Sequence, residues 1–123
     1  MLIIRQEQYD AIRESAQGEF DAGMIEHLRT HFPKETGPLD DAELLALVQE
    51  GRHHAWRRGA DHPGAVCRFI DVRFVLGPSF DTKPELEWVT APLRDQSIND
   101  ADARIEEMAE RALQWIARRG ERA

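Results

Sequence analysis

The run Val66–Leu76, VCRFIDVRFVL, restricts the fold most, because it fits only a helix or a paired strand. Ile70, Val72 and Phe74 alternate with charged residues, as in a half-buried strand. Val66, Ile70 and Phe74 also recur every four residues, as in a helix. No other segment of the chain alternates, so a strand here would leave its backbone donors and acceptors unsatisfied. The run therefore predicts a helix.

This helix should begin at Pro63 and end at Gly77, with the glycine as a left-handed terminator. Apolar residues cover nearly every side, which indicates a central helix packed by several neighbours. Asp71 lies in its middle and must face water, pair with an arginine or accept buried hydrogen bonds, because burial without a partner is costly. Arg68, three residues earlier, is a possible partner. A structural role and a binding role for Asp71 both remain open.

Two helices are predicted before this one. Apolar residues three or four positions apart indicate a first helix from about Gln6 to His31: Tyr9, Ile12, Ala16, Phe20, Met24 and Leu28. Pro33 ends it, because a residue before proline is pushed out of the helical region. The second helix begins with Asp40 as N-cap and Glu43 three residues later, as a capping box requires. Gly59 is well placed just past its end.

The C-terminal part predicts one short and one long helix. The short helix should begin near Pro84 with Thr82 and Glu85 as a second capping box, and Pro92 should cut it short. Trp88 is expected to anchor it in the core.

The long helix should run from about Asp100 to Arg119, with Asn99 or Asp100 as its cap and Gly120 as its terminator. Its expected buried face consists of Ile105, Met108, Ala109, Ala112, Leu113 and Ile116. Together these segments predict an all-α fold, a compact array of four main helices and one short helix around a single core, in one helical domain over residues 1–123.

Composition and charge narrow the function. The chain is 41% hydrophobic and 32% charged, and it lacks an apolar run of the ~20 residues that span a bilayer. Its N-terminus does not resemble a signal peptide, and its one cysteine excludes an internal disulfide and a multi-cysteine zinc site. The cytoplasm is the expected compartment.

The net charge of −7 argues against a nucleic-acid binder, and no basic recognition helix supports a helix-turn-helix reader of DNA. Residues 51–75 differ from the rest, because their five basic and two acidic side chains give a net +3. This basic segment could lie against the acidic flanks within the fold or face an acidic partner.

The five histidines are candidate metal ligands. His27 and His31 have the spacing at which two imidazoles of one helix share an ion, but zinc needs three or four converging ligands. The H-E-x-x-H pattern is absent. A di-iron bundle needs two Glu-x-x-His pairs, and only Glu50 and His53 fit. Structural histidines are favoured over a small metal-dependent enzyme, and neither a metal nor a cofactor is predicted.

Nucleophilic chemistry has equally little support. Cys67 would need a base and an exposed, electropositive setting, yet it lies among Val66, Phe69 and Ile70, where free cysteine behaves as a small core residue. Ser79 lacks the glycines of a nucleophile elbow. No phosphate-cradling loop occurs. The sequence therefore predicts no catalytic residues.

A resemblance supplies the functional hypothesis. It is carried by Ile-Arg-x-Glu-Gln at residues 4–8, by His-Leu-Arg-x-x-Phe-Pro at residues 27–33, by Phe-Ile-Asp within Val66–Leu76, by Gly-x-x-Phe-Asp at residues 77–81, and by Trp88 and Leu93. In these segments the chain resembles small helical accessory proteins encoded beside type VI secretion spike, PAAR-tip and effector genes in proteobacteria.

The resemblance implies an adaptor or co-chaperone without enzymatic activity. Such a protein would bind a secretion effector, or the larger adaptor that loads it, and help it to reach the spike. Aromatic residues carry interfaces disproportionately, so the segment Gly77–Trp88 is the candidate contact region. The candidate partner-binding residues are Asp71, Phe80, Asp81 and Trp88. The alternative function is that of an immunity protein that neutralises a neighbouring toxin.

Overall fold

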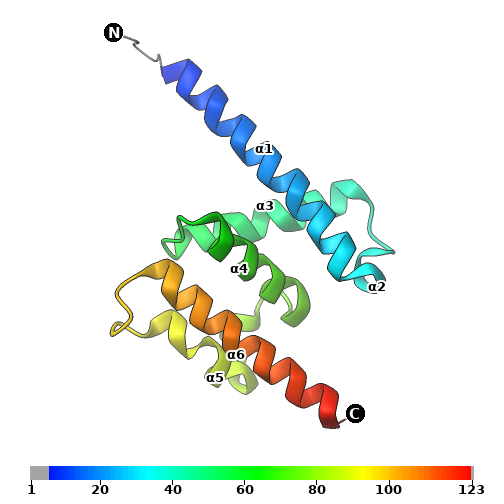
Figure 1. The fold of residues 1–123 in the computed structure, drawn as a ribbon, viewed down its shortest axis with the longest axis vertical. Helices are drawn as coiled ribbons and strands as arrows, with labels where there is room; N and C mark the ends of the chain where they lie inside the picture. Colours follow the sequence, from blue (N-terminus) through cyan, green and yellow to red (C-terminus); the bar gives the residue numbers. More distant parts are fainter. Residues whose placement is uncertain (1–5, 123) are drawn as a thin grey trace. The chain divides into compact units, whose positions relative to one another are not determined.

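The chain folds into helices joined by short turns. The computed structural model describes the backbone of residues 6–122 and the side chains of residues 17–119. In chain order the helices are α1 (Gln6–His31), α2 (Pro33–Thr36), α3 (Asp41–Arg57), α4 (Pro63–Leu76), η1 (Phe80–Thr82), η2 (Pro84–Leu86), α5 (Glu87–Thr90), η3 (Ala91–Arg94) and α6 (Ala101–Arg122), where η marks a 3-10 helix (Figure 1). Residues 6–122 contain no strand, which confirms the all-α prediction and the helical interpretation of Val66–Leu76.

Contacts between Cα atoms divide the chain into two compact units, Met1–Gln49 and Glu50–Ala123, with the boundary inside α3. The predicted single domain over residues 1–123 stays a prediction, and each unit is described by itself. Within the part of the chain that the structure describes, every helix is too short or too polar to cross a membrane.

In the first unit, α1 ends at the predicted position because Phe32, before Pro33, leaves the helical region with φ −129° and ψ 58°. Of the predicted apolar stripe, Met24 and Leu28 are buried and Phe20 is half-buried. The side chains of Tyr9, Ile12 and Ala16, like the resemblance segment 4–8, lie outside the residues whose side chains are described.

Arg29 stabilises the turn that follows α1 by hydrogen bonds. Its Nη2 donates to Asp41 Oδ1 at 2.6 Å and to the Leu39 carbonyl at 3.1 Å. Its Nη1 donates to the carbonyl of the buried Thr36 at 3.4 Å. One guanidinium therefore satisfies carbonyl groups of the turn and fixes the start of α3 against the end of α1.

The predicted ends of α3 are confirmed. Asp40 Oδ1 accepts from the Glu43 N–H at 2.8 Å, and Glu43 Oε1 accepts from the Asp40 N–H at 3.3 Å, which completes the capping box. At the other end, Gly59 has φ +91° and donates to the Trp56 carbonyl at 2.8 Å, while Ala60 donates to the Ala55 carbonyl at 3.1 Å. This pair of bonds is a Schellman motif.

Helix α4 begins at Pro63 and ends at Leu76, as predicted. The His62 side chain caps it, because Nδ1 accepts from the Gly64 N–H at 3.1 Å. Gly77 has the expected positive φ of 101°, but its ψ of 159° places it in an extended, glycine-only region. The predicted left-handed terminator is therefore wrong in detail: the chain leaves α4 by extending away from it.

The segment after α4 differs most from the prediction. The Thr82 hydroxyl donates back to the Ser79 carbonyl at 3.0 Å, and Lys83 at the start of η2 makes no side-chain cap. The predicted capping box of Thr82 and Glu85 is thus wrong. Instead of one helix from Pro84, the chain forms η1, η2, the single turn α5 and η3.

Helix α6 starts as predicted, because Asp100 Oδ2 accepts from the Ala103 N–H at 3.2 Å. It does not end at Gly120, since the helical backbone continues to Arg122. Ile105, Met108, Ala109 and Ala112 are buried as expected. Leu113 and Ile116, also expected in the core, are 57% and 36% exposed. The apolar residues of α6 therefore continue beyond the part of the helix that other elements bury.

In the second unit, α6 packs along α4, while α5 and η3 pack against α6 (Figure 1). The last two turns of α3 also approach α4 closely, because a Cβ added to Gly51 would lie 3.0 Å from Ile70 Cγ1. Glycine at this position therefore allows close contact between the two helices.

The basic segment 51–75 pairs largely within this unit. Arg58 forms an ion pair with Asp81, Arg68 Nε lies 3.2 Å from Glu106 Oε2, and Arg73 Nη2 lies 2.8 Å from Glu50 Oε1. Of the two interpretations of this segment, internal pairing accounts for these three arginines. The charged residues in the apolar helix α4 thus connect it to its neighbours.

Candidate functional site

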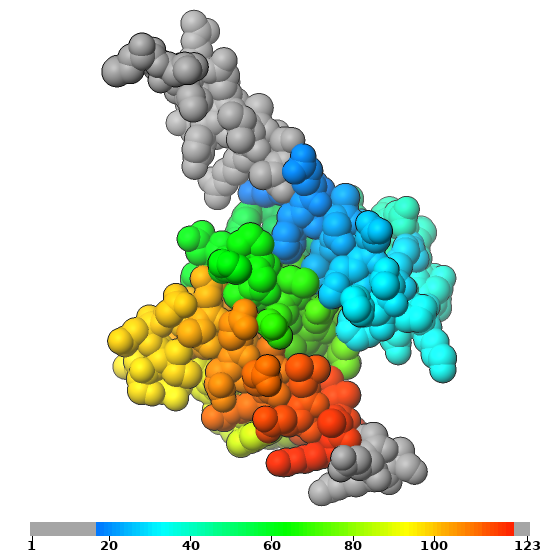
Figure 2. All heavy atoms as spheres, in the orientation of Figure 1, coloured from blue at the N-terminus to red at the C-terminus, as the bar shows by residue number. Residues whose placement is uncertain are grey.

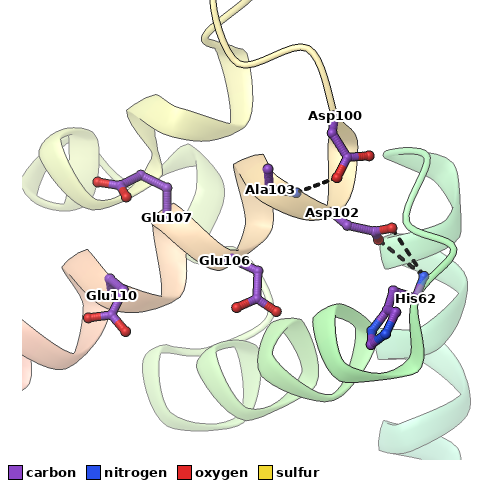
Figure 3. A pocket seen from close by; sticks show the side chains of 7 residues that line it. All are labelled: His62, Asp100, Asp102, Ala103, Glu106, Glu107 and Glu110. Carbon is purple, nitrogen blue, oxygen red and sulfur yellow. Dashed lines mark hydrogen bonds between the residues drawn. The ribbon is translucent and has the colours of Figure 1, made fainter.

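An acidic hollow lies where the start of α6 meets the loop before α4. It has a volume of about 480 Å³, and Figure 3 shows the residues that line it: His62, Asp100, Asp102, Ala103, Glu106, Glu107 and Glu110. The acidic side chains spread from several sides of α6 instead of meeting at one point (Figure 3). A metal site or an acid–base pair needs converging groups.

Most polar groups of this hollow already have structural partners. Asp102 Oδ1 accepts from the backbone N–H groups of Asp61 and His62 at 2.9 and 3.2 Å. His62 Nδ1 caps α4, and Asp100 caps α6. Glu106 pairs with Arg68. These bonds hold the start of α4 against α6, so the hollow has a structural role.

Asp102→Ala should lower the free energy of unfolding by about 1 kcal/mol, because two backbone donors lose a charged acceptor that is only partly shielded from water. Asp102→Asn, which keeps one acceptor oxygen, should lose less. Urea denaturation followed by circular dichroism measures both. The exposed Glu110 is the matched control, and Glu110→Ala should change the value by less than about 0.5 kcal/mol. Equal losses at the two positions would contradict the assignment.

Cys67 and Asp71 lie one turn apart on α4, and both are half-buried. Burial, followed by the nearby Asp71 carboxylate, raises the pKa of the Cys67 thiol from 9.0 to about 11, although Arg68 acts in the opposite direction. Such a thiol is a poor nucleophile at neutral pH. Arg68, the candidate partner of Asp71, forms an ion pair with Glu106. A binding role for Asp71 stays a prediction.

The raised pKa predicts slow alkylation of Cys67. A pKa of about 11 instead of 9.0 leaves roughly a hundredfold less thiolate at neutral pH, so iodoacetamide should label the folded protein far more slowly than the urea-unfolded protein. As the pH rises from 9 to 11 the unfolded thiol ionises first, and the free energy of unfolding should therefore fall. Cys67→Ala should lack this component. Equal labelling rates in the folded and unfolded protein would contradict the prediction.

Two of the sequence-predicted contact residues hold the fold. Phe80 is 1% exposed, and its ring meets the Phe69 ring edge-on, with centroids 5.7 Å apart. Asp81 forms an ion pair with Arg58, just past the end of α3. Together they fix η1 against α3 and α4. The Phe80 side chain is therefore inaccessible to a partner, and the Asp81 carboxylate is already engaged.

Trp88 is the sequence-predicted residue that the structure exposes. Leu86, Val89 and Thr90 are buried, and Trp88 points outward from the same turn with 45% of its surface exposed. The expectation that it anchors the core is wrong, because the buried residues of the single turn α5 are Val89 and Thr90.

Two arginines of α6 lie over the Trp88 ring. The guanidinium carbons of Arg111 and Arg118 are 5.2 and 5.6 Å from its centroid, within the range of cation–π attraction. Arg111 Nη1 also donates to the Trp88 carbonyl at 2.9 Å. Arg111 and Arg118 are seven residues apart and hence on the same side of α6. These contacts restrict the positions that the indole can take.

Trp115 lies between these arginines on the same side of α6, and the guanidinium carbon of Arg119 is 4.6 Å from the centroid of its ring. We call the surface formed by Trp88, Arg111, Trp115, Arg118 and Arg119 the Trp88 face. The second half of α6, orange to red in Figure 2, lies at the molecular surface. Leu113 and Ile116 lie on other sides of the helix, because each is offset by one or two residues from this spacing.

The sequence interpretation missed the arginines of this surface. A usable signal was present: residues 111–119, RALQWIARR, contain three arginines and no acidic residue. Arg111, Trp115 and Arg118 are spaced to share one side of a helix. That a tryptophan from a separate turn would lie against them could not be deduced from the spacing.

Two further ring contacts involve residues that are not part of the Trp88 face. Within α3, the guanidinium carbon of Arg52 lies 4.9 Å from the centroid of the Trp56 ring. The rings of His27 and His31 lie 4.5 Å apart on α1. Comparison with protein-family models, with curated proteins and with solved structures gave no significant match to this chain. The function is therefore argued from the Trp88 face.

Proposed function

We propose that this chain is a non-enzymatic accessory protein that binds another protein in the cytoplasm, with a type VI secretion effector or its larger adaptor as the partner that it helps to reach the spike. The observation that supports protein binding is the exposed Trp88, which has Arg111 and Arg118 over its ring. The secretion link comes from the sequence resemblance described above.

The Trp88 face has the residue types that are typical of the centre of a protein–protein interface. Tryptophan and arginine are the residues most enriched among those that dominate binding energy. An indole held by the backbone of α5 and by two guanidinium groups loses little conformational freedom on binding, which reduces the entropic cost of association. An exposed tryptophan that is restricted in this way is preorganised for binding.

The secretion role is tested by co-expression with the effector or adaptor encoded next to the gene. We expect the accessory protein to increase both the amount of soluble effector and the amount that is secreted. Trp88→Ala should abolish both increases. Trp56→Ala is the matched control, because this second exposed tryptophan belongs to α3 and not to the Trp88 face. Circular dichroism of both variants checks that the fold is retained.

Other outcomes would contradict the proposal. If effector toxicity is neutralised while solubility and secretion stay the same, the protein acts as an immunity protein. If co-expression changes none of these, the secretion role is wrong. If Trp56→Ala abolishes the effect and Trp88→Ala does not, the binding surface lies elsewhere on the chain.

A further inference from the structure

We propose that the Trp88 face binds an acidic segment of its partner, a short stretch in which carboxylates flank an apolar or aromatic side chain. The inference rests on the proposed function for its partner, a protein, and adds the chemistry that is recognised. The carboxylates would pair with Arg118 and Arg119, and the apolar side chain would pack against Trp88.

The charge of α6 changes sign along its length. Residues 100–110 hold five acidic side chains and one basic one, whereas residues 111–119 hold three arginines and no acidic residue. Favourable interaction with the helix dipole accounts for some of this pattern, but not for the position of Arg118 over the indole of another element. The second half of α6 is a positive surface on a chain of net charge −7.

The arginines of the Trp88 face differ in their engagement. Arg111 is held twice, by the Trp88 carbonyl at 2.9 Å and by Glu107 Oε1 at 3.5 Å. Among the side chains of residues 17–119, no carboxylate forms a salt bridge with Arg118 or Arg119. Both are exposed. Arg111 is thus a structural support, and the other two remain available to a ligand.

Arg118 and Arg119 are exposed, so their N–H donors are accessible to a partner. A guanidinium uses its flat face on an indole, while its N–H groups point outward in its own plane. These donors match the two oxygens of a carboxylate. Arg118 over Trp88 and Arg119 over Trp115 therefore offer charged donors to carboxylates, and each has an indole beside it for an apolar neighbour. This combination favours a mixed acidic and apolar segment.

Carboxylates beside the Trp88 face favour a short segment over a long polyanion. Glu107 lies next to Arg111 on α6, and Glu87 precedes Trp88 on α5. A nucleic acid or an anionic membrane would extend over these carboxylates and be repelled, in addition to the repulsion from the net charge of the chain. A few partner residues can contact the arginines without reaching the carboxylates.

The test is selection from a random peptide library displayed on phage, with the full-length protein as bait. We expect the recovered peptides to be enriched in Asp and Glu next to leucine or an aromatic residue. Recovery should be lost when the bait carries Trp88→Ala or Arg118→Glu. Arg57→Glu, a charge reversal at an exposed arginine near the end of α3, is the matched control and should recover the same peptides.

Fluorescence anisotropy with a recovered peptide then measures affinity. Trp88→Ala and Arg118→Glu should each weaken binding about tenfold or more, and replacement of the peptide carboxylates by amides should do the same. Recovered peptides without acidic enrichment, no recovery at all, or equal loss in Arg57→Glu would each overturn the inference. Tighter binding of RNA or phosphatidylserine vesicles would also overturn it.

The two proposals fail separately. Selection of acidic peptides on the Trp88 face with no effect on effector secretion would retain the recognition chemistry and reject the secretion role. An effect on secretion that depends on Trp88 but not on Arg118, without acidic enrichment, would retain the function and reject the acidic segment.

Discussion

Phe80→Ala should lower the free energy of unfolding of this protein by about 3–5 kcal/mol, the usual cost of truncating a fully buried phenylalanine. The side chain is 1% exposed and makes an edge-on contact with Phe69 of α4. Its loss removes apolar contact area, leaves a cavity that the short 3-10 helices cannot close, and releases η1 from α4. Urea denaturation monitored by far-ultraviolet circular dichroism measures the change.

The control and the conservative variant make this prediction specific. Val75→Ala removes an exposed apolar side chain near the end of α4 and should change stability by less than about 0.5 kcal/mol. Phe80→Leu should cost less than Phe80→Ala, because more of the cavity stays filled. A loss below about 1 kcal/mol for Phe80→Ala would show that this ring does not hold the segment before α5.

Glu50→Ala should have the second-largest effect on stability, a loss of about 1–3 kcal/mol. The Arg73 side chain is only 7% exposed, and its Nη2 lies 2.8 Å from Glu50 Oε1. Removing the carboxylate leaves a buried cation without this partner, which is more costly than losing a surface ion pair. Because the Glu50 side chain itself is partly solvated, the loss should stay below that of a fully buried pair.

Substitution of the other partner, Arg73, separates the effect of charge on stability from the effect of packing. Arg73→Met keeps an apolar stem of similar length and removes the buried charge, so it should change stability by no more than about 1 kcal/mol. With Arg73→Met in place, Glu50→Ala should cost almost nothing further. If Glu50→Ala destabilises both backgrounds equally, the ion pair is not the reason for the loss.

The long helices could be predicted because their ends depend on local chemistry. Helix ends depend on residues close by in the sequence. The structure shows the capping box of Asp40 and Glu43, the non-helical Phe32 before Pro33, and the hydrogen bonds at Gly59. Thr82 failed as a cap because its hydroxyl had a competing local acceptor, the Ser79 carbonyl. Gly120 failed as a terminator because a glycine permits, but does not require, the end of a helix.

Burial was predicted less well, since it depends on where neighbouring elements end. The spacing along α6 identified its apolar side correctly up to Ala112, but it carried no information on the extent of the covering elements. Leu113 and Ile116 therefore looked like core residues and are exposed. The same limit applies to Trp88, since a single turn has no periodicity from which its outward side could be deduced.

The candidate site was predictable in part. Trp88 was chosen from its residue type, and its exposure makes it usable for contact. Phe80 and Asp81 were chosen from the same segment, but they connect that segment to α4 and α3. Arg111 and Arg118 were missed because their closeness to Trp88 is a tertiary contact between elements that are distant in sequence.

The placement of the indoles has an optical consequence. Each of the three tryptophans has a cationic neighbour, but Trp88 is the most exposed and should emit at the longest wavelength. Replacement of Trp56 and Trp115 by phenylalanine would leave Trp88 as the sole tryptophan, which can be excited selectively. Any molecule that displaces water from that ring should then shift its emission to the blue, so the protein carries its own unlabelled reporter of occupancy.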